Sequence, residues 1–146
     1  MNWFKDAIVY QIFIDRFTAP DNCDWNKPDF MGGTIKGIIG KLPYIQELGI
    51  NTIWISPFYK TSAYHGYHIT DFYSVDSHFG TVDDIKELIK KCHDKGIKFI
   101  ADFVPNHCSN EHPFFIEAQK NKNSDYHEWF YWKKWQINYS SICHSY

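Results

Sequence analysis

Asp102-Phe103-Val104-Pro105-Asn106-His107 decides the fold prediction, because polar groups here follow directly on an apolar segment. The residues before it, including Ile97, Phe99 and Ile100, are typical of a buried strand, which we predict over Lys98 to Val104. In parallel α/β proteins, binding and catalytic groups gather where the strands end. An acid, an amide and an imidazole in this position therefore predict a functional edge of a parallel sheet.

Two more strands and a helix are predicted upstream of this segment. Ala7–Ile14 and Thr52–Ile55 are rich in β-branched and aromatic residues, as buried strands are. Apolar residues over 35–48 recur at helical spacing, and Gly49 would end that helix. Pro43 interrupts the pattern, so we expect a kink or a short first turn before it.

A second helix is predicted between Thr81, which can cap its N-terminus, and Gly96, which can end it. The resulting order β-α-β-α-β implies parallel strands joined by right-handed crossovers. The loops after the first two strands, Asp15–Gly33 and Ser56–Gly80, are long, and they place the functional surface at the strand ends. Three strands cannot close a barrel, and parallel sheets are covered on both faces, so we expect part of a larger domain.

Composition limits the classes of function. The chain has 146 residues and a net charge of -2, which allows one domain with a core and favours no nucleic-acid partner. No apolar stretch is long enough for a membrane span and no signal peptide is recognisable, so we expect a soluble, cytoplasmic protein. The four cysteines show neither CxxC nor zinc spacing. The 12 Phe, 10 Tyr and 6 Trp suit a core, and they also suit stacking platforms for sugars or bases.

The second long loop contains the aromatic sequence Tyr64–Tyr73. Gly66 would allow a sharp turn that presents His65 and Tyr67 on the wall of a cleft. Simple packing of aromatic side chains over the rim of the sheet explains the same composition equally well. His65 and His68 have the spacing of a metal pair, although a solvated pair of histidines is the more common reading of this pattern.

Each polar residue at the strand ends also has a structural explanation. Asp102 can cap local backbone N–H groups, and His107 can be an ordinary rim histidine. The side-chain oxygen of Asn106 is of the type that calcium prefers. Asp15 and Arg16 after the first strand could be a catalytic carboxylate with its partner, but a structural ion pair that ties the strand end to its neighbours is the better interpretation.

Four separated segments together resemble the α-amylase superfamily, glycoside hydrolase family 13. Val9–Phe17 is similar to the first strand of that family and Gly32–Ile45 to its first helix. Gly66–Thr81 resembles the second long loop, and Asp102–His107 matches the first signature region. The resemblance covers the chain from Tyr10 to about Trp132.

This resemblance implies an α/β fold, namely a partial (β/α)8 TIM barrel that holds the first three strands and two helices. It also implies a small domain inserted after the third strand. We therefore expect residues 1–110 to belong to the barrel and residues 111–146 to begin the inserted domain. That second part includes a cluster of aromatic residues in the sequence, namely Trp129, Phe130, Tyr131, Trp132 and Trp135.

The resemblance also implies roles for individual residues. Tyr67 would stack on the sugar next to the scissile bond, and His107 would hydrogen-bond the same sugar, with His65 nearby. Asp102 would be a buried organiser of the site. Asn106 would be a calcium ligand in those members that bind calcium, and no organic cofactor is expected.

The implied activity is hydrolysis or transfer of α-glucosidic bonds with retention, on an α-glucan or maltooligosaccharide. That chemistry uses two carboxyl groups about 5–5.5 Å apart, which the family takes from later barrel strands, and we expect these groups beyond Tyr146. We therefore assign no catalytic residue within the chain and expect it to be inactive alone.

Two other classes of function remain as alternatives. The first is a non-catalytic amylase-like protein that binds sugar or a partner. The second, less favoured, is a phosphate-binding α/β enzyme, for which the glycine motifs are missing from the sequence.

Overall fold

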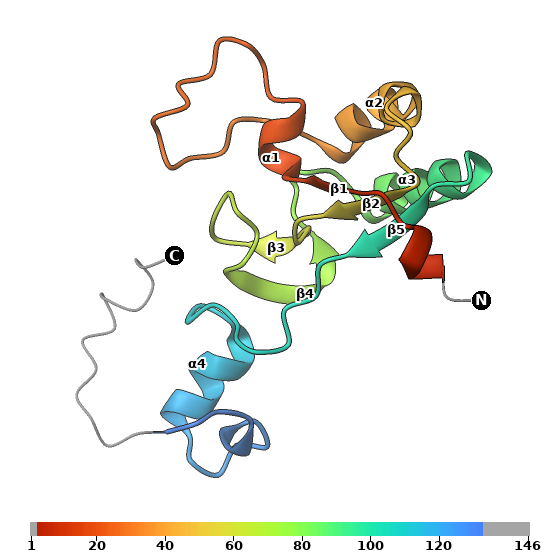
Figure 1. Cartoon of the computed structure of the whole chain (residues 1–146). Coiled ribbons are helices and arrows are strands. Elements are labelled where there is room, and N and C mark those ends of the chain that lie inside the picture. The colour runs from red at the N-terminus through yellow and green to blue at the C-terminus, as the bar shows by residue number, and fades with distance from the viewer. Residues whose placement is uncertain (1–2, 133–146) are drawn as a thin grey trace.

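The computed structural model describes residues 3–132 and shows a parallel sheet of three strands (Figure 1). The strands are β1 (Val9–Ile12), β2 (Thr52–Ile55) and β5 (Lys98–Ala101), in the spatial order β1-β2-β5. Gln11 lies opposite Trp54 in the register of β1 and β2. The predicted parallel arrangement is confirmed.

Two strands are shorter than predicted. The first strand does not extend over Ala7–Ile14, because the short helix α1 (Ile14–Phe17) begins directly after Phe13. The third strand ends at Ala101 and not at Val104, because the chain turns away from β2 beyond the last pairing of Ile55 with Ala101. β5 therefore ends directly before the polar residue Asp102, whereas the apolar residues Phe13 and Ile14 separate the end of β1 from Asp15.

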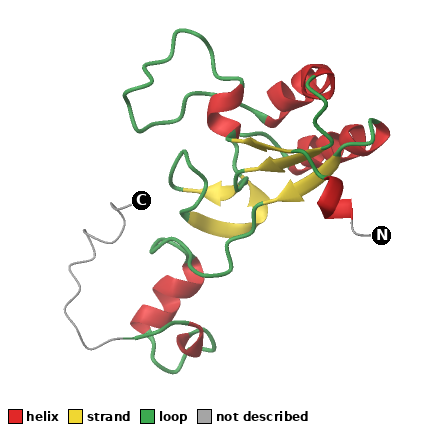
Figure 2. Cartoon of the chain, in the orientation of Figure 1, coloured by secondary structure: helices red, strands yellow, loops and turns green. Residues whose placement is uncertain are grey.

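Two long helices, α2 (Ile35–Glu47) and α3 (Val82–Asp94), lie along one face of this sheet (Figure 2). The predicted cap of α3 is confirmed: the Thr81 hydroxyl accepts from the backbone N–H of Asp84, and the Asp84 carboxylate accepts from that of Thr81. Such a capping box satisfies backbone donors that the first helical turn leaves free.

The first long helix runs through its proline. α2 begins at Ile35, after the cap residue Thr34, and is continuous with Pro43 inside it, so the expected short first turn before the proline is not observed. Gly49 follows the helix at φ +75°, a left-handed conformation that glycine adopts without strain, which confirms the predicted end.

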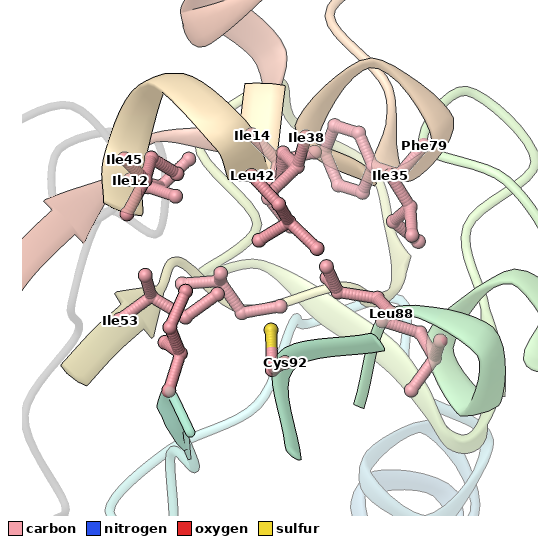
Figure 3. Packing of buried hydrophobic residues seen from close by; sticks show 13 residues of the cluster. Ile12, Ile14, Ile35, Ile38, Leu42, Ile45, Ile53, Phe79, Leu88 and Cys92 are labelled. Carbon is pink, nitrogen blue, oxygen red and sulfur yellow. The ribbon is translucent and has the colours of Figure 1, made fainter. Parts of the chain in front are cut away.

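The core fills the space between the sheet and these helices (Figure 3). Ile12, Ile53 and Ile55 from the strands are fully buried against side chains of α2 and α3. The core residues contributed by the two helices are Ile35, Ile38, Leu42, Ile45, Ile85, Leu88 and Cys92. Since β-strand side chains alternate between faces, Gln11, Trp54 and Ile100 point to the opposite face.

The second long loop contains an antiparallel hairpin that the sequence did not reveal. Its strands are β3 (Tyr59–Thr61) and β4 (Ile69–Val75). The buried carboxylate of Asp76 accepts the backbone N–H of Thr61 at 3.0 Å and thereby fixes the end of the hairpin. The long connection predicted between Ser56 and Gly80 therefore contains two strands that the sequence analysis did not assign.

Beyond β5 the chain forms α4 (Pro113–Lys120) and a 3-10 turn, η2 (His127–Trp129), on the side of the hairpin away from α2 and α3 (Figure 1). Phe114 stacks on Tyr126, with ring centroids 4.1 Å apart, and meets Trp129 edge-on. Within residues 3–132, no helix combines the length and the apolar character required to cross a lipid bilayer.

Part of the predicted inserted domain lies outside the described residues. This applies to Trp135, which we expect among its aromatic residues, and to its predicted extent as far as Tyr146. Residues 111–132 of that prediction are described, and they contain α4 and η2.

Candidate functional site

A cleft of about 400 Å³ opens at the carboxyl ends of β1 and β2. Its lining residues are Gln11, Phe13, Ser56, His65 and Tyr67. The first three come from the sheet face opposite the core and from the strand ends, and the last two come from the loop that joins β3 and β4. The edge of the sheet that the sequence predicts to be functional therefore has an open cleft with both polar and aromatic walls.

The hydroxyl of Tyr67 donates a hydrogen bond to Oδ2 of Asp102 at 2.9 Å. This contact joins the hairpin loop to the residue that follows β5. Burial, together with the hydrogen bond to Asp102 and its negative charge, raises the pKa of Tyr67 to about 12. Tyr67 therefore keeps its proton throughout the physiological range and holds Asp102 in a fixed position.

Gly66 makes the turn that presents the two aromatic residues beside it. Its φ of +82° lies in the left-handed region, and a Cβ atom at this position would lie 2.2 Å from the carbonyl oxygen of Pro57. Both the conformation and the close approach exclude a larger residue. The predicted sharp turn at Gly66 is confirmed.

The Nδ1 atom of His65 accepts the backbone N–H of Tyr67 at 3.1 Å. This bond assigns the proton of the neutral ring to Nε2, which is then a donor available for the cleft. Burial, and the nearby ring of His68, hold the pKa of His65 below its usual range. A neutral His65 stacked beside Tyr67, with 5.9 Å between the ring centroids, forms one wall of the cleft.

Asp102 was expected to be buried, or else to cap local backbone N–H groups, and the structure shows neither. It is half-buried and not buried, because the face of β5 that it follows is not covered by the described residues. Its hydrogen bond within residues 3–132 comes from the Tyr67 hydroxyl, so it holds another loop in place and does not cap its own backbone.

Asn106 and His107 lie beyond the cleft walls. Both side chains are exposed, and Nδ2 of Asn106 lies 3.4 Å from Nδ1 of His107. Calcium takes about six to eight oxygen ligands, of which the predicted ligand Asn106 would supply one. In the part of the chain that the structure describes, no three His, Cys, Asp or Glu side chains gather at a point where they could hold a metal ion.

The carboxylate of Asp15 has a structural role. It is fully buried, accepts the backbone N–H of Met31 at 3.0 Å and lies 3.2 Å from the Arg16 guanidinium. These contacts attach the first long loop to the end of β1. The structural ion pair is therefore the arrangement observed.

Three cleft residues, Gln11, Phe13 and Ser56, were missed by sequence reasoning. Gln11 and Phe13 alternate with the buried Ile12, and Ser56 directly follows β2. Successive side chains of a strand point to opposite faces, and this alternation can be continued one residue past the end of the strand. Applied to β1 and β2, it predicts that these three residues lie on the face opposite the core.

The catalytic carboxyl groups are a separate case among the predicted site residues. We expect them beyond Tyr146, and Tyr146 itself lies outside the described residues 3–132. The structure therefore describes the residues that are predicted to bind sugar, and both that role and the location of the catalytic groups stay predictions.

A parallel sheet covered on one face, with its cleft at the strand ends, is the arrangement expected of an α/β protein, and a segment of an α/β barrel has this form. A family model described as "Alpha amylase, catalytic domain" matches residues 11–142. Alpha-amylase 2 of Dictyoglomus thermophilum is 46% identical over 134 residues, which are 90% of this chain and 24% of that protein. The cyclomaltodextrinase of Thermoanaerobacter pseudethanolicus is 42% identical over 147 residues, covering 92% of this chain and 26% of that protein.

A solved structure gives the same result. The α-amylase of Geobacillus thermoleovorans in complex with acarbose superimposes with a TM-score of 0.77 at 39% identity, over 93% of this chain and 30% of that one. The chain belongs to the α-amylase family, glycoside hydrolase family 13, at the N-terminal part of its catalytic domain. It spans about a quarter of the length of the curated relatives that it matches.

Proposed function

We propose that this chain is part of a retaining glycosidase that acts on α-glucans or maltooligosaccharides, and that it supplies sugar-binding residues to the site. The observation that carries the proposal is the hydrogen bond between Tyr67 and Asp102 at the edge of the cleft. Relatives named α-amylase, cyclomaltodextrinase and oligo-1,6-glucosidase support α-glucosidic bonds as the substrate class.

The cleft walls suit a sugar chemically. A pyranose ring has an apolar face that packs on an aromatic ring, and Tyr67 offers such a ring at the cleft wall. Sugar hydroxyls need both donors and acceptors, which His65 and Gln11 provide through Nε2–H and the side-chain amide. We propose that His107 reaches the same sugar from the exposed segment after β5.

The chemistry of bond cleavage needs more than this cleft contains. Retaining hydrolysis uses two carboxyl groups about 5–5.5 Å apart, one as nucleophile and one as acid/base. Among the cleft-lining residues and the hydrogen-bonded partner of Tyr67, Asp102 is the one carboxylate, and its Oδ2 is engaged by the Tyr67 hydroxyl. The proposal therefore assigns sugar binding to this chain and places both catalytic carboxyl groups beyond Tyr146.

The segment after β5 belongs to the same proposal. We assign residues 111–146 to the start of an inserted domain, and the aromatic packing of Phe114 on Tyr126 and Trp129 supports a separate small core there. Asn106 lies at the junction of the two parts, where it would give one oxygen ligand to calcium. No step of sugar binding in this proposal depends on that ion.

The experiment is a titration of the 146-residue chain with maltotriose, followed by saturation-transfer NMR of the sugar protons. We expect binding by the wild-type chain, weaker binding by Tyr67→Phe and loss of binding by Tyr67→Ala. Tyr44→Ala is the matched control, because Tyr44 is a half-exposed tyrosine on α2. Equal binding by wild type and Tyr67→Ala would overturn the proposed site.

A further inference from the structure

We propose that Arg16, which does not line the cleft, is a positioning residue that holds its His65–Tyr67 wall in place through the ring of Tyr64. This inference rests on the proposed function, because it concerns the same sugar-binding wall. Its physical basis is a series of contacts that runs from the end of β1 to the loop between β3 and β4.

The series of contacts begins at the guanidinium of Arg16, which is held in place by Asp15. Arg16 is the one arginine in the sequence, and its side chain is 19% exposed. Nη1 lies 3.2 Å from the buried carboxylate of Asp15, which is itself held by the backbone N–H of Met31. The guanidinium is thus attached to an anion that cannot move without detaching the first long loop.

The second step is a cation–π contact. The guanidinium carbon of Arg16 lies 4.5 Å from the centroid of the Tyr64 ring and 5.8 Å from that of Phe13. Nη1 is buried and forms no hydrogen bond within residues 3–132, so charge and ring contacts are what hold this group. Cation–π attraction is strongest where the cation is removed from water, as it is here.

The third step connects Tyr64 to the cleft wall. The ring of Tyr64, which is not among the lining residues, meets the ring of His65 edge-on with 5.4 Å between centroids. His65 in turn accepts the backbone N–H of Tyr67 and stacks on its ring. Tyr64 therefore acts as a spacer between a fixed cation and a sugar-facing wall.

The arrangement explains why an arginine is used at this position. A guanidinium is planar and weakly hydrated, so it can face an aromatic ring and pair with a carboxylate at the same time. A lysine keeps the charge but not the planar contact. A methionine keeps only the apolar stem, so the Tyr64 ring loses its partner and the wall formed by His65 and Tyr67 loses its support.

The test compares maltotriose affinity across variants of the 146-residue chain by saturation-transfer NMR. We expect Arg16→Met to weaken binding roughly tenfold, as the loss of a partly buried cation–π contact would. Arg16→Lys should bind with intermediate affinity. Lys36→Met is the matched control, because Lys36 pairs with Asp84 at 3.5 Å on the helical side of the molecule; its affinity should equal that of the wild type.

Tyr64→Leu provides a second route to the same contact if Arg16→Met fails to fold. We expect Tyr64→Leu to weaken binding to the same degree, and Arg16→Met added to it to cause no further loss. Wild-type affinity in folded Arg16→Met or in folded Tyr64→Leu overturns the inference while leaving the sugar site intact. Absence of maltotriose binding by the wild-type chain contradicts the proposed function itself.

Discussion

The two faces of the parallel sheet differ in what covers them. On one face Ile12, Ile53 and Ile55 are fully buried under α2 and α3. On the other face Gln11 is exposed and Trp54 is half-buried, and the cleft lies at the end of that face. The described residues therefore cover one face of the sheet with helices and leave the face with the cleft open.

The two faces therefore contribute differently to the free energy of unfolding and to the candidate site. Buried aliphatic side chains contribute about 1.5–3 kcal/mol each, so the helical face provides most of the stability of the described part. Polar and aromatic groups at the strand ends contribute less to stability and remain available to a ligand.

The same substitution on the two faces should have unequal effects. Ile53→Ala leaves a cavity under the helices and should lower the free energy of unfolding by about 2–5 kcal/mol. Ile100→Ala, on the open face and already half-exposed, should lower it by about 1 kcal/mol. Urea denaturation of both variants measures the difference, and equal losses would contradict the division between the faces.

Replacement of glycine by alanine should have opposite effects on stability in the loop that carries the cleft wall and in helix α2. Gly66→Ala meets the Pro57 carbonyl oxygen and a φ of +82°, so we expect it to lower the free energy of unfolding by about 2–3 kcal/mol and to weaken maltotriose binding. Gly40→Ala in α2 meets no atom within 4 Å and should raise stability by about 0.5–1 kcal/mol. Thermal melts of both variants, together with a maltotriose titration, measure these changes; a stabilised Gly66→Ala would refute the proposed turn.

The stability of the chain should depend on pH because His65, in the cleft wall, titrates differently in the folded and unfolded chain. The pKa of His65 in the folded chain is below its ordinary value of 6.5, so the unfolded chain binds its proton more readily. The neutral, buried form of His65 therefore contributes fully to the free energy of unfolding above pH 6.5, and this contribution is lost as the pH falls below 6.5. The melting temperature should drop between about pH 7 and pH 5. His65→Gln should reduce that drop; an unchanged drop would assign the pH dependence to other groups, such as His112, whose pKa burial also lowers.

The sequence predicted the covered face of the sheet well, for a physical reason. β2 was found with its observed bounds, and Thr81 and Gly96 marked the ends of α3, because burial and capping depend on residues that are close in sequence. The hairpin of β3 and β4 was missed, because polar residues run through both strands and β4 has one buried residue, Ile69.

The candidate site was predicted in part of its members, His65 and Tyr67 among the cleft-lining residues, and not in its contacts. Tyr67, His65 and Asp102 were named from their positions, yet the bond between Tyr67 and Asp102 joins residues 35 positions apart, and the sequence alone does not show it. The contact of Arg16 with Tyr64 is non-local in the same way. Local patterns identify the residue types, whereas the pairing of loops determines what each residue does.

The most direct measurement is a reducing-sugar assay of the pure 146-residue chain with maltotriose, run beside the binding titration of the same sample. We predict that the chain binds maltotriose and releases no glucose or maltose, because we assign sugar binding to its cleft and place the two catalytic carboxyl groups outside it. Release of reducing sugar that is abolished by Asp102→Asn would contradict it, since catalysis would then reside within this chain.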